Sequence, residues 1–268
     1  MKSIHQFASA QEPLHCSMLD SLNRCPMKHV LMYIEEYEDL AGEAAATGSA
    51  AHAGIAAYHR SLTHEEGLEA GLATLQASLE SFPRADLNDA AQHFTHYVAD
   101  PRHQTAKIIA VERPVRLVLP PADDDPTGLD IVIEGTIDQI RREDGRLIVV
   151  DVKTGGTPGW QMLHDYLFQI AGYAAAATAE LGETVEPGYL IRTQGYRQKG
   201  VNPAEALEGI IWPVRLSLAQ CQIYLDQVRD LVAQVRAGSV RFGPGMHCSY
   251  CPMQGIWTCT ARAERHWA

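Results

Sequence analysis

Four short segments with the composition of β-strands lie close together in the middle of the chain, and helical patterns surround them. They are rich in Val, Ile and Leu, and polar residues separate them: Lys107–Glu112, Val115–Leu119, Ile131–Ile140 and Leu147–Val152. Glu143-Asp144-Gly145 predicts a tight hairpin between the last two segments. Such a chain can bury its strands only in a sheet that helices cover.

Helical patterns occupy most of the remaining sequence. Apolar residues recur at helical spacing in 17–40, where Ser17 is the expected N-cap, and in 48–58, 62–82, 86–99, 160–181 and 217–237. Two more strands are predicted: Tyr189–Arg192 and Glu208–Val214. With 268 residues, of which 46% are hydrophobic, the chain can form a sizeable core. We therefore predict an α/β fold with α+β character, in which helices flank a central mixed sheet. We expect one domain over 1–268, with a helical N-terminal part (1–100), a sheet core (105–215) and a C-terminal helix with a Cys-rich tail (216–268).

The charge of the chain argues against general binding to polyanions. Its formal net charge is −11, and a strongly acidic protein repels phosphate chains. Acidic residues dominate before residue 190, including the presumed surface cluster Asp123-Asp124-Asp125, and basic residues outnumber them afterwards. In that later part, one basic stretch with an aromatic residue could follow a phosphate backbone, although plain surface is the more ordinary interpretation: Arg192, Tyr196, Arg197 and Lys199.

The sequence gives no sign of a membrane or secreted protein. No apolar run approaches the roughly 18 residues of a membrane span, and the N-terminal segment lacks the apolar core of a signal peptide. Six cysteines are too few for a disulfide scaffold. We expect a cytoplasmic protein with reduced thiols and no membrane partner.

Two carboxylates and a lysine occupy the two strands that the predicted hairpin joins. Asp138 ends the motif Glu134-Gly-Thr-Ile-Asp138, and Asp151 and Lys153 end the following strand. Because every second side chain of a strand lies on the same face, Asp151 and Lys153 project together, and Asp138 can reach the same point. Neighbouring carboxylates repel each other and favour a divalent cation, Mg²⁺ or Mn²⁺, and the lysine can stabilise charge on a phosphate. The set suits metal-assisted phosphodiester hydrolysis; the alternative is a surface salt bridge at the end of a hairpin.

Four further residues are candidates for the same site. Gln169 and Tyr173 are four residues apart and share a helix face, although Tyr173 could simply pack in the core. His52 lies in an Ala-rich helical pattern; as a neutral ligand it would favour Mn²⁺, but an isolated helical histidine is more often structural. Glu112 could add an accessory carboxylate, although a structural role is the stronger interpretation.

The cysteines suggest a second metal centre. Three of them form a C-x2-C-x7-C pattern near the C-terminus: Cys248, Cys251 and Cys259. Closely spaced cysteines in a reducing compartment favour ligation of a metal or cluster, and both zinc and a [4Fe–4S] cluster need four ligands. Cys25 is the best distant candidate for the fourth, and His247 is an alternative for zinc. Cys221 reads as a small core residue, and Cys16 is ambiguous.

Taken together, these motifs resemble the RecB-like branch of the PD-(D/E)XK nuclease superfamily. The resemblance rests on five motifs in the expected order along nearly the whole chain: Ser17-x-Leu19 with Cys25-Pro26, Gly48-x-x-x-His52, Gly135-x-x-Asp138, Asp151-Val-Lys153-Thr-Gly155 and Gln169-x-x-x-Tyr173. The cysteines resemble those of the iron–sulfur subset, the AddB nuclease domain and the stand-alone CRISPR-adaptation exonucleases, in which one cysteine precedes the nuclease core and three follow it. The x7 spacing before Cys259 is wider than in that pattern, which leaves zinc or an atypical cluster open.

The resemblance implies a restriction-endonuclease-like core and a role for each motif. Four groups would hold the catalytic metal: His52, Asp138, Asp151 and the Val152 carbonyl. Lys153 would orient or activate the water, and Gln169 and Tyr173 would position the metal site or the DNA strand. The resemblance also implies four ligands for a [4Fe–4S] cluster that joins the two ends of the chain as a structural staple: Cys25, Cys248, Cys251 and Cys259.

We therefore expect a metal-dependent deoxyribonuclease, an exonuclease on single-stranded or end-exposed DNA, that carries a structural iron–sulfur cluster. The sequence contains no Walker A motif, so the nuclease would act alone or beside a separate helicase or a CRISPR integrase. Two alternatives stay open: a nucleic-acid-binding or assembly component on a nuclease fold with weak or no catalysis, and a zinc-stapled nuclease. The sequence does not predict the cutting polarity, the choice between DNA and RNA, the pathway or the oligomeric state.

Overall fold

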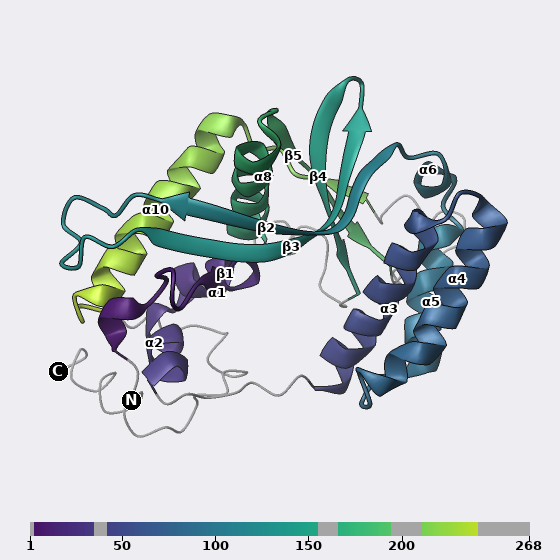
Figure 1. Cartoon of the computed structure of the whole chain (residues 1–268), viewed down its shortest axis with the longest axis horizontal. Helices are drawn as coiled ribbons and strands as arrows, with labels where there is room; N and C mark the ends of the chain where they lie inside the picture. Colours follow the sequence, from purple (N-terminus) through teal and green to yellow (C-terminus); the bar gives the residue numbers. More distant parts are fainter. Residues whose placement is uncertain (1–2, 35–41, 155–165, 194–210, 241–268) are drawn as a thin grey trace, which may run out of the picture.

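Six strands form one mixed sheet in the part of the chain that the structure describes, and this sheet is the central layer of the molecule (Figure 1). The computed structural model describes residues 3–34, 42–154, 166–193 and 211–240. The strands are β1 (Leu14–His15), β2 (Ile108–Leu119), β3 (Ile131–Glu143), β4 (Arg146–Lys153), β5 (Val185–Arg192) and β6 (Ile211–Pro213). Their order is β1-β3-β4-β5-β6, and β2 pairs along the other edge of β3. β1 runs parallel to β3 and β4 runs parallel to β5, whereas the remaining pairs are antiparallel.

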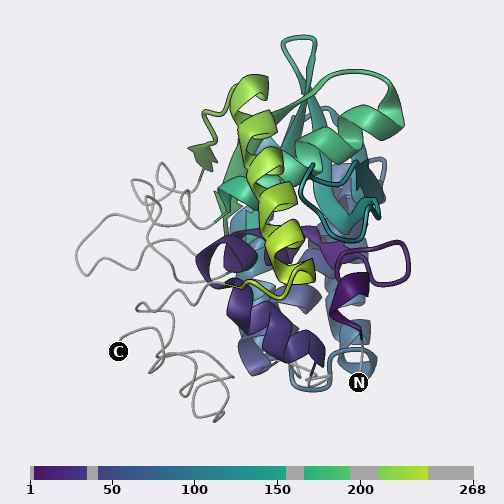
Figure 2. The same cartoon turned by 90° about the vertical axis from the view of Figure 1, so that its left-hand side faces the viewer.

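Helices cover both faces of this sheet. One group packs around a first core: η1 (Ile4–Gln6), η2 (Cys16–Met18), α1 (Leu19–Arg24), α2 (Pro26–Ile34), α8 (Leu167–Leu181) and α10 (Leu218–Arg236). The other group packs around a second core: α3 (Glu43–Arg60), α4 (His64–Ala77) and α5 (Leu87–Val98). Two short helices contact this group, η3 (Ser78–Glu80) beside α3 and α4, and α6 (Pro101–Gln104) beside α5. Figure 1 separates the two groups to the left and right of β4, and in Figure 2 the yellow-green α10 crosses the front of the sheet. This arrangement confirms the predicted α/β class with a central mixed sheet flanked by helices.

β4 lies between the two cores. Leu147 and Val149 belong to the first core, while Ile148 and Val150 belong to the second. A strand that is buried on both faces is expected to be an apolar run, and this run is broken only near its end, where the Asp151 side chain is 2% exposed. The end of β4 therefore brings a carboxylate into the interior.

The hairpin between β3 and β4 has the predicted turn. Asp144 and Gly145 have φ angles of 50° and 80°, which is the left-handed conformation that both central residues of a type I′ turn adopt. Glu143 pairs with Arg146 across the turn, so the register of the two strands is fixed from this end.

β2 is longer than predicted. The sequence indicated two strands with a break before Val115, but β2 is continuous and includes Pro114. The prediction is wrong because β2 is an edge strand of the described sheet, and an edge strand tolerates proline since one of its sides needs no ladder hydrogen bonds.

The predicted helix over 17–40 is also wrong. The chain forms η2, then α1, then α2, with a break at Cys25, whose φ and ψ are −153° and 85°. Pro26 causes this break because the residue before a proline is disfavoured in the helical conformation. Ser17 is not an N-cap, since α1 begins after Met18 without a side-chain cap. Residues 35–40 lie outside the described residues.

The later helices agree better with their predictions. Ser217 caps α10 in a capping box with Gln220. α8 begins at Leu167, and 160–165 of the predicted helix lie outside the described residues. Within the described ranges, no helix is long and apolar enough to cross a membrane.

Candidate metal centre

β3 and β4 part where the acidic residues lie. Their ladder ends at the pair formed by Gln139 and Val150. Past this pair the Val152 amide donates to Asp138 Oδ2 at 2.6 Å, so a side chain takes the place of a strand partner. The carboxylate satisfies a backbone N–H that a widened ladder would otherwise leave unpaired. Side chains from both strands and from α3 and α8 can therefore meet at this point.

Three side chains of metal-ligand type converge there from different elements. His52 of α3, Glu112 of β2 and Asp138 of β3 each place a ligand atom within 4.8 Å of the other two. His52 Nδ1 lies 3.3 Å from Asp138 Oδ1. Glu112 has a φ of 47°, a left-handed conformation that costs a residue with a Cβ atom on the order of 1–3 kcal/mol. Such strain persists only where the surrounding structure maintains it, and it concentrates at functional sites.

Lys153 and Asp151 form a second group with α8. Lys153 Nζ lies 2.8 Å from Asp151 Oδ2 and donates to Gln169 Oε1 at 3.3 Å. Gln169 Nε2 donates to Asp151 Oδ1 at 3.4 Å and to Tyr173 Oη at 3.1 Å. The ammonium also lies 4.2 Å from the centroid of the Tyr166 ring, within the range of a cation–π contact. Gln169 thus contacts both members of the Lys153–Asp151 pair.

Burial and crowding set the charge states of these groups. Burial raises the pKa of Asp151 to about 6, and Lys153 offsets only part of this rise. Burial also raises the pKa of Glu112 to about 7, and the neighbouring Asp138 adds to the rise. Burial opposes the charged form of His52, but Asp138 outweighs it and raises the histidine pKa to about 9. His52 in turn outweighs burial at Asp138 and lowers the pKa of that carboxyl.

These residues fit a divalent cation. Their donor set consists of carboxylate oxygens, which Mg²⁺ and Mn²⁺ prefer, and an imidazole nitrogen, which favours Mn²⁺. The raised pKa values of Glu112 and Asp151 reflect carboxylates that lack sufficient positive charge around them. A cation would supply that charge and reverse the local balance.

Two glycines let the helices approach the site. At Gly48 of α3, a Cβ atom would lie 2.7 Å from Thr154 Oγ1, just past the end of β4. At Gly135 of β3, a Cβ atom would lie 2.8 Å from the Tyr173 ring. A larger residue at either position would displace the helix that carries His52 or Tyr173. The glycines of the two motifs therefore have a packing role.

Sequence reasoning missed Asp20. Its carboxylate accepts hydrogen bonds from the backbone N–H groups of Phe168 and Gln169 at the start of α8. The contact joins residues 148 and 149 positions apart, and no local pattern indicates it.

Other predicted site residues are only partly described. Arg192 pairs in register with Lys153 at the end of β5 and is buried. Its predicted companions lie outside the described residues: Tyr196, Arg197 and Lys199. The Val152 side chain packs in the second core, and the role of its carbonyl stays a prediction.

The cysteine prediction is tested at one end only. Cys25 lies buried at the break between α1 and α2 and makes no disulfide with another cysteine of the described ranges. Its three predicted partners lie outside the described residues: Cys248, Cys251 and Cys259. Cys221 is a core residue as expected. Cys16 is fully buried, and burial raises the pKa of its thiol to about 12, so it is a packing residue.

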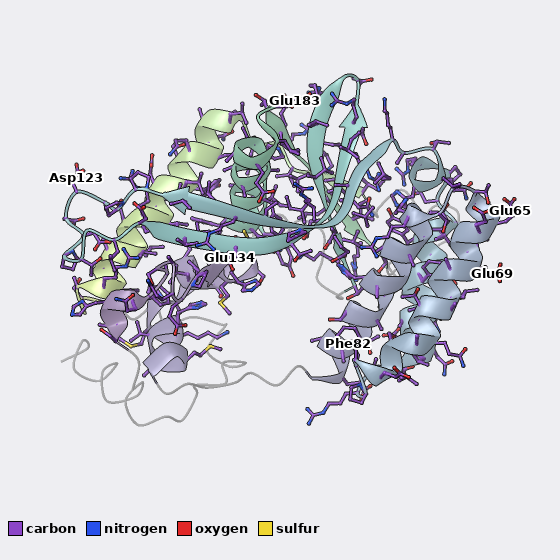
Figure 3. All side chains as sticks on the ribbon, in the orientation of Figure 1. Glu65, Glu69, Phe82, Asp123, Glu134 and Glu183 are labelled. Carbon is purple, nitrogen blue, oxygen red and sulfur yellow. The ribbon has the colours of Figure 1, made fainter. Side chains whose placement is uncertain are left out.

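Acidic residues away from the site lie mostly at the periphery. Figure 3 labels Glu65, Glu69, Asp123 and Glu183 at the outer parts of the molecule. Asp125 departs from the prediction that its cluster is solvated. Its side chain is fully buried and pairs with Arg236 Nη1 at 2.7 Å, because the chain before β3 packs against the end of α10.

Comparison with known proteins places this geometry in a family. The family model described as "PD-(D/E)XK nuclease superfamily" matches residues 13–256. A search of curated proteins finds no match. The family match covers the sheet, α3 and α8, and it supports a metal-dependent nuclease without distinguishing the RecB-like branch or its iron–sulfur subset. Because the match extends over most of the sequence, the chain belongs to the PD-(D/E)XK nuclease superfamily.

Proposed function

We propose that the protein is a metal-dependent deoxyribonuclease, an exonuclease that hydrolyses phosphodiester bonds of single-stranded or end-exposed DNA. One observation carries the proposal: three carboxylates, a histidine and a lysine meet where β3 and β4 part. Membership of a nuclease superfamily gives this set its chemistry.

The ligands of a Mg²⁺ or Mn²⁺ ion would come from three strands and one helix: His52, Glu112, Asp138, Asp151 and the Val152 carbonyl. When bound, such an ion supplies positive charge for a water nucleophile and for the phosphate oxygens. Glu112 is included because of its position, since its carboxylate lies in one group with the His52 imidazole and the Asp138 carboxylate.

Lys153 stabilises charge and does not remove a proton. Burial opposes its charged form, but the neighbouring Asp151 and Asp138 carboxylates outweigh this and raise the lysine pKa. A fixed ammonium can orient the attacking water and stabilise negative charge that develops on the phosphate. Gln169 holds the ammonium and the Asp151 carboxylate together, and the Tyr173 hydroxyl accepts from the same amide.

The finer parts of the proposal rest on the order of the sequence motifs. The choice of DNA, the exonuclease mode and a separate helicase or CRISPR integrase as partner follow from the RecB-like resemblance. The basic residues Arg197 and Lys199 with Tyr196 are proposed to contact the DNA strand. A [4Fe–4S] cluster is proposed on Cys25 and the three C-terminal cysteines, and zinc is the alternative at the same ligands.

A cleavage assay tests the proposal. The full chain is incubated with end-labelled linear and with circular single- and double-stranded DNA, and with RNA, in Mg²⁺, Mn²⁺ or EDTA. Asp151→Asn and Lys153→Ala should abolish cutting, whereas the exposed controls Asp124→Asn and Lys107→Ala should cut like the wild type. Loss of linear but not circular DNA indicates an exonuclease. A wild type that cuts nothing in either metal would refute the nuclease proposal, and iron, sulfide and zinc analysis decides the cysteine centre.

A further inference from the structure

Asp20 contacts α8 in a way that fixes the start of this helix. Its side chain is buried, and it accepts from the Phe168 N–H at 3.0 Å and from the Gln169 N–H at 2.9 Å. The first N–H groups of a helix have no partner within the helix, and Tyr166 at the N-cap gives no side-chain cap. The Asp20 carboxylate of α1 therefore caps α8 in place of a side chain next to α8 in the sequence.

We propose that Asp20 is a positioning residue for the nuclease site and that it acts through Gln169. The backbone of Gln169 is held by Asp20, while its side chain contacts Lys153 Nζ and Asp151 Oδ1. The place of the Gln169 amide thus depends on a carboxylate in α1. This inference rests on the proposed function of the site.

α1 and α8 pack closely against each other. A Cβ atom on Gly172 of α8 would lie 2.8 Å from Leu19 Cδ1, and Leu19 is fully buried. Apolar packing alone does not fix the orientation of the first turn of α8, whereas the two directional hydrogen bonds that Asp20 accepts do. A negative charge at this end also interacts favourably with the helix dipole.

Asparagine is the informative substitution at Asp20. It has nearly the same shape and keeps one acceptor oxygen, but its amide group donates and cannot accept. One of the two N–H groups of α8 would lose its partner. The first turn of α8 should then shift or fray, and Gln169 should lose its fixed place.

A second capped helix provides a matched control. Asp86 Oδ1 accepts from the N–H groups of Asn88 and Asp89 at 2.9 and 3.1 Å at the start of α5. None of the proposed ligands or of the residues that contact Lys153 lies in α5. Both N–H groups use the same oxygen of Asp86, which an asparagine would keep, so alanine is the informative change here. Asp86→Ala removes a comparable cap without touching the path from α1 to Gln169.

A double-mutant cycle on cleavage tests the inference. In Mn²⁺ and well below the melting temperature, Asp20→Asn and Gln169→Ala should each lower kcat on the order of ten- to a hundred-fold. The double variant should cut no more slowly than Gln169→Ala alone, because both changes act on one interaction. Asp86→Ala should lower the melting temperature, since loss of an N-cap costs about 1 kcal/mol, and leave kcat within about twofold of the wild type. The inference would be overturned if the fold-loss in kcat of the double variant equalled the product of the two single losses. An unchanged kcat for Asp20→Asn would overturn it as well.

Hydrogen exchange separates this inference from the nuclease proposal. In the metal-free full chain, Asp20→Asn should speed amide exchange at the start of α8, and Asp86→Ala should not. A wild type that cuts no DNA refutes the proposed nuclease alone, and the exchange then decides whether Asp20 holds Gln169. Unchanged exchange at Phe168 and Gln169 in Asp20→Asn overturns the positioning role whether or not the protein cuts.

Discussion

Two polar clusters in the interior include consecutive residues of β3, Asp138 in one and Gln139 in the other, and they differ in how their charges are balanced. The site cluster contains six residues: His52, Glu112, Asp138, Asp151, Lys153 and Gln169. The tyrosine cluster contains five: His59, Tyr97, His103, Gln139 and Arg141. Both interrupt apolar packing at β3, yet only the first has the composition of a reactive site.

The groups of the tyrosine cluster satisfy one another. Tyr97 Oη accepts from Gln139 Nε2 at 2.7 Å and from Arg141 Nη2 at 2.9 Å. Its proton then points to His59 Nε2, 2.7 Å away. Arg141 also donates to Gln139 Oε1 at 2.9 and 2.7 Å. Apart from His103 Nε2, which is buried without a hydrogen-bond partner among the described residues, these groups form a satisfied network of neutral acceptors around a buried guanidinium, and such networks fix a core.

The site cluster is incomplete in its charges. Its carboxylates outnumber its fixed positive charges, and burial raises the pKa of Glu112 and Asp151. Buried polar groups therefore do not mark a site by their presence alone, whereas a surplus of buried carboxylates with raised pKa values does.

The largest effect is expected from a change at the two neighbours on β3. Asp138→Asn should lower cleavage at least 100-fold, as loss of a main electrostatic group does, and should keep the fold. Gln139→Leu should keep kcat in the folded protein and reduce stability. Cleavage assays well below the melting temperature measure kcat, and thermal unfolding followed by circular dichroism measures stability. If Gln139→Leu lost cleavage as severely as Asp138→Asn at low temperature, the two clusters would not be distinct.

Removal of the buried cation should have the next largest effect. Arg141→Ala leaves the Gln139 side-chain carbonyl without a donor and removes one of the two donors of the Tyr97 hydroxyl. It should reduce the free energy of unfolding by about 3 kcal/mol. Urea denaturation measures the loss. The exposed neighbour Arg146, which pairs with Glu186, is the control, and Arg146→Ala should change stability by less than about 1 kcal/mol. Equal losses for both arginines contradict the network.

Metal should stabilise one cluster and leave the other unaffected. At Mn²⁺ a hundredfold above its Kd, the wild type should gain about 2.7 kcal/mol in the free energy of unfolding. Arg141→Ala should gain as much, and Asp138→Asn should gain little. Thermal unfolding with and without Mn²⁺ measures the gain. A full gain in Asp138→Asn would mean that Mn²⁺ binds elsewhere.

Acid should destabilise the protein through the tyrosine cluster. Burial and, to a smaller extent, the neighbouring Arg141 lower the pKa of His59 and of His103 to about 3. Above the ordinary histidine pKa of 6.5 both states hold neutral rings. Below it the unfolded chain binds protons that the folded protein excludes, so stability falls by at most about 1.4 kcal/mol per histidine and pH unit. His59→Gln should flatten this loss in urea denaturation between pH of about 7 and 5, and the exposed His15→Asn should not; equal slopes in all three proteins contradict the assignment.

Most of the fold is predictable from local sequence signals. The turn at Asp144 and Gly145 and the cap at Ser217 depend on a few adjacent residues, and such signals can be read without a structure. The alternation that places Asp151 and Lys153 on one face of β4 is equally local, and their 2.8 Å contact agrees with it.

Contacts between distant segments could not be predicted. Asp20 looks like a residue of an ordinary first turn, and only the packing of α1 on α8 makes it a cap. The sequence favours a structural role for Glu112, because no local pattern shows that β2 lies opposite Asp138 in the ladder. Gln139 and Arg141 fall between the motifs, and their network depends on Tyr97, 42 and 44 positions earlier.

The smallest expected effect is a gain in stability at the site itself. Glu112→Gln removes a carboxylate from beside Asp138 and His52, so the metal-free protein should gain about 1 kcal/mol, as relief of a strained functional site commonly gives. The same change should weaken Mn²⁺ binding in calorimetry, because a charged ligand is lost. Glu134→Gln is the control, since Glu134 of β3 is a half-exposed partner of Arg116, which lies on β2 like Glu112, and it should alter neither property. A Glu112→Gln protein that is less stable without metal would mean that Glu112 is already satisfied, and the contrast between the two clusters would then depend on Asp138 and Asp151 alone.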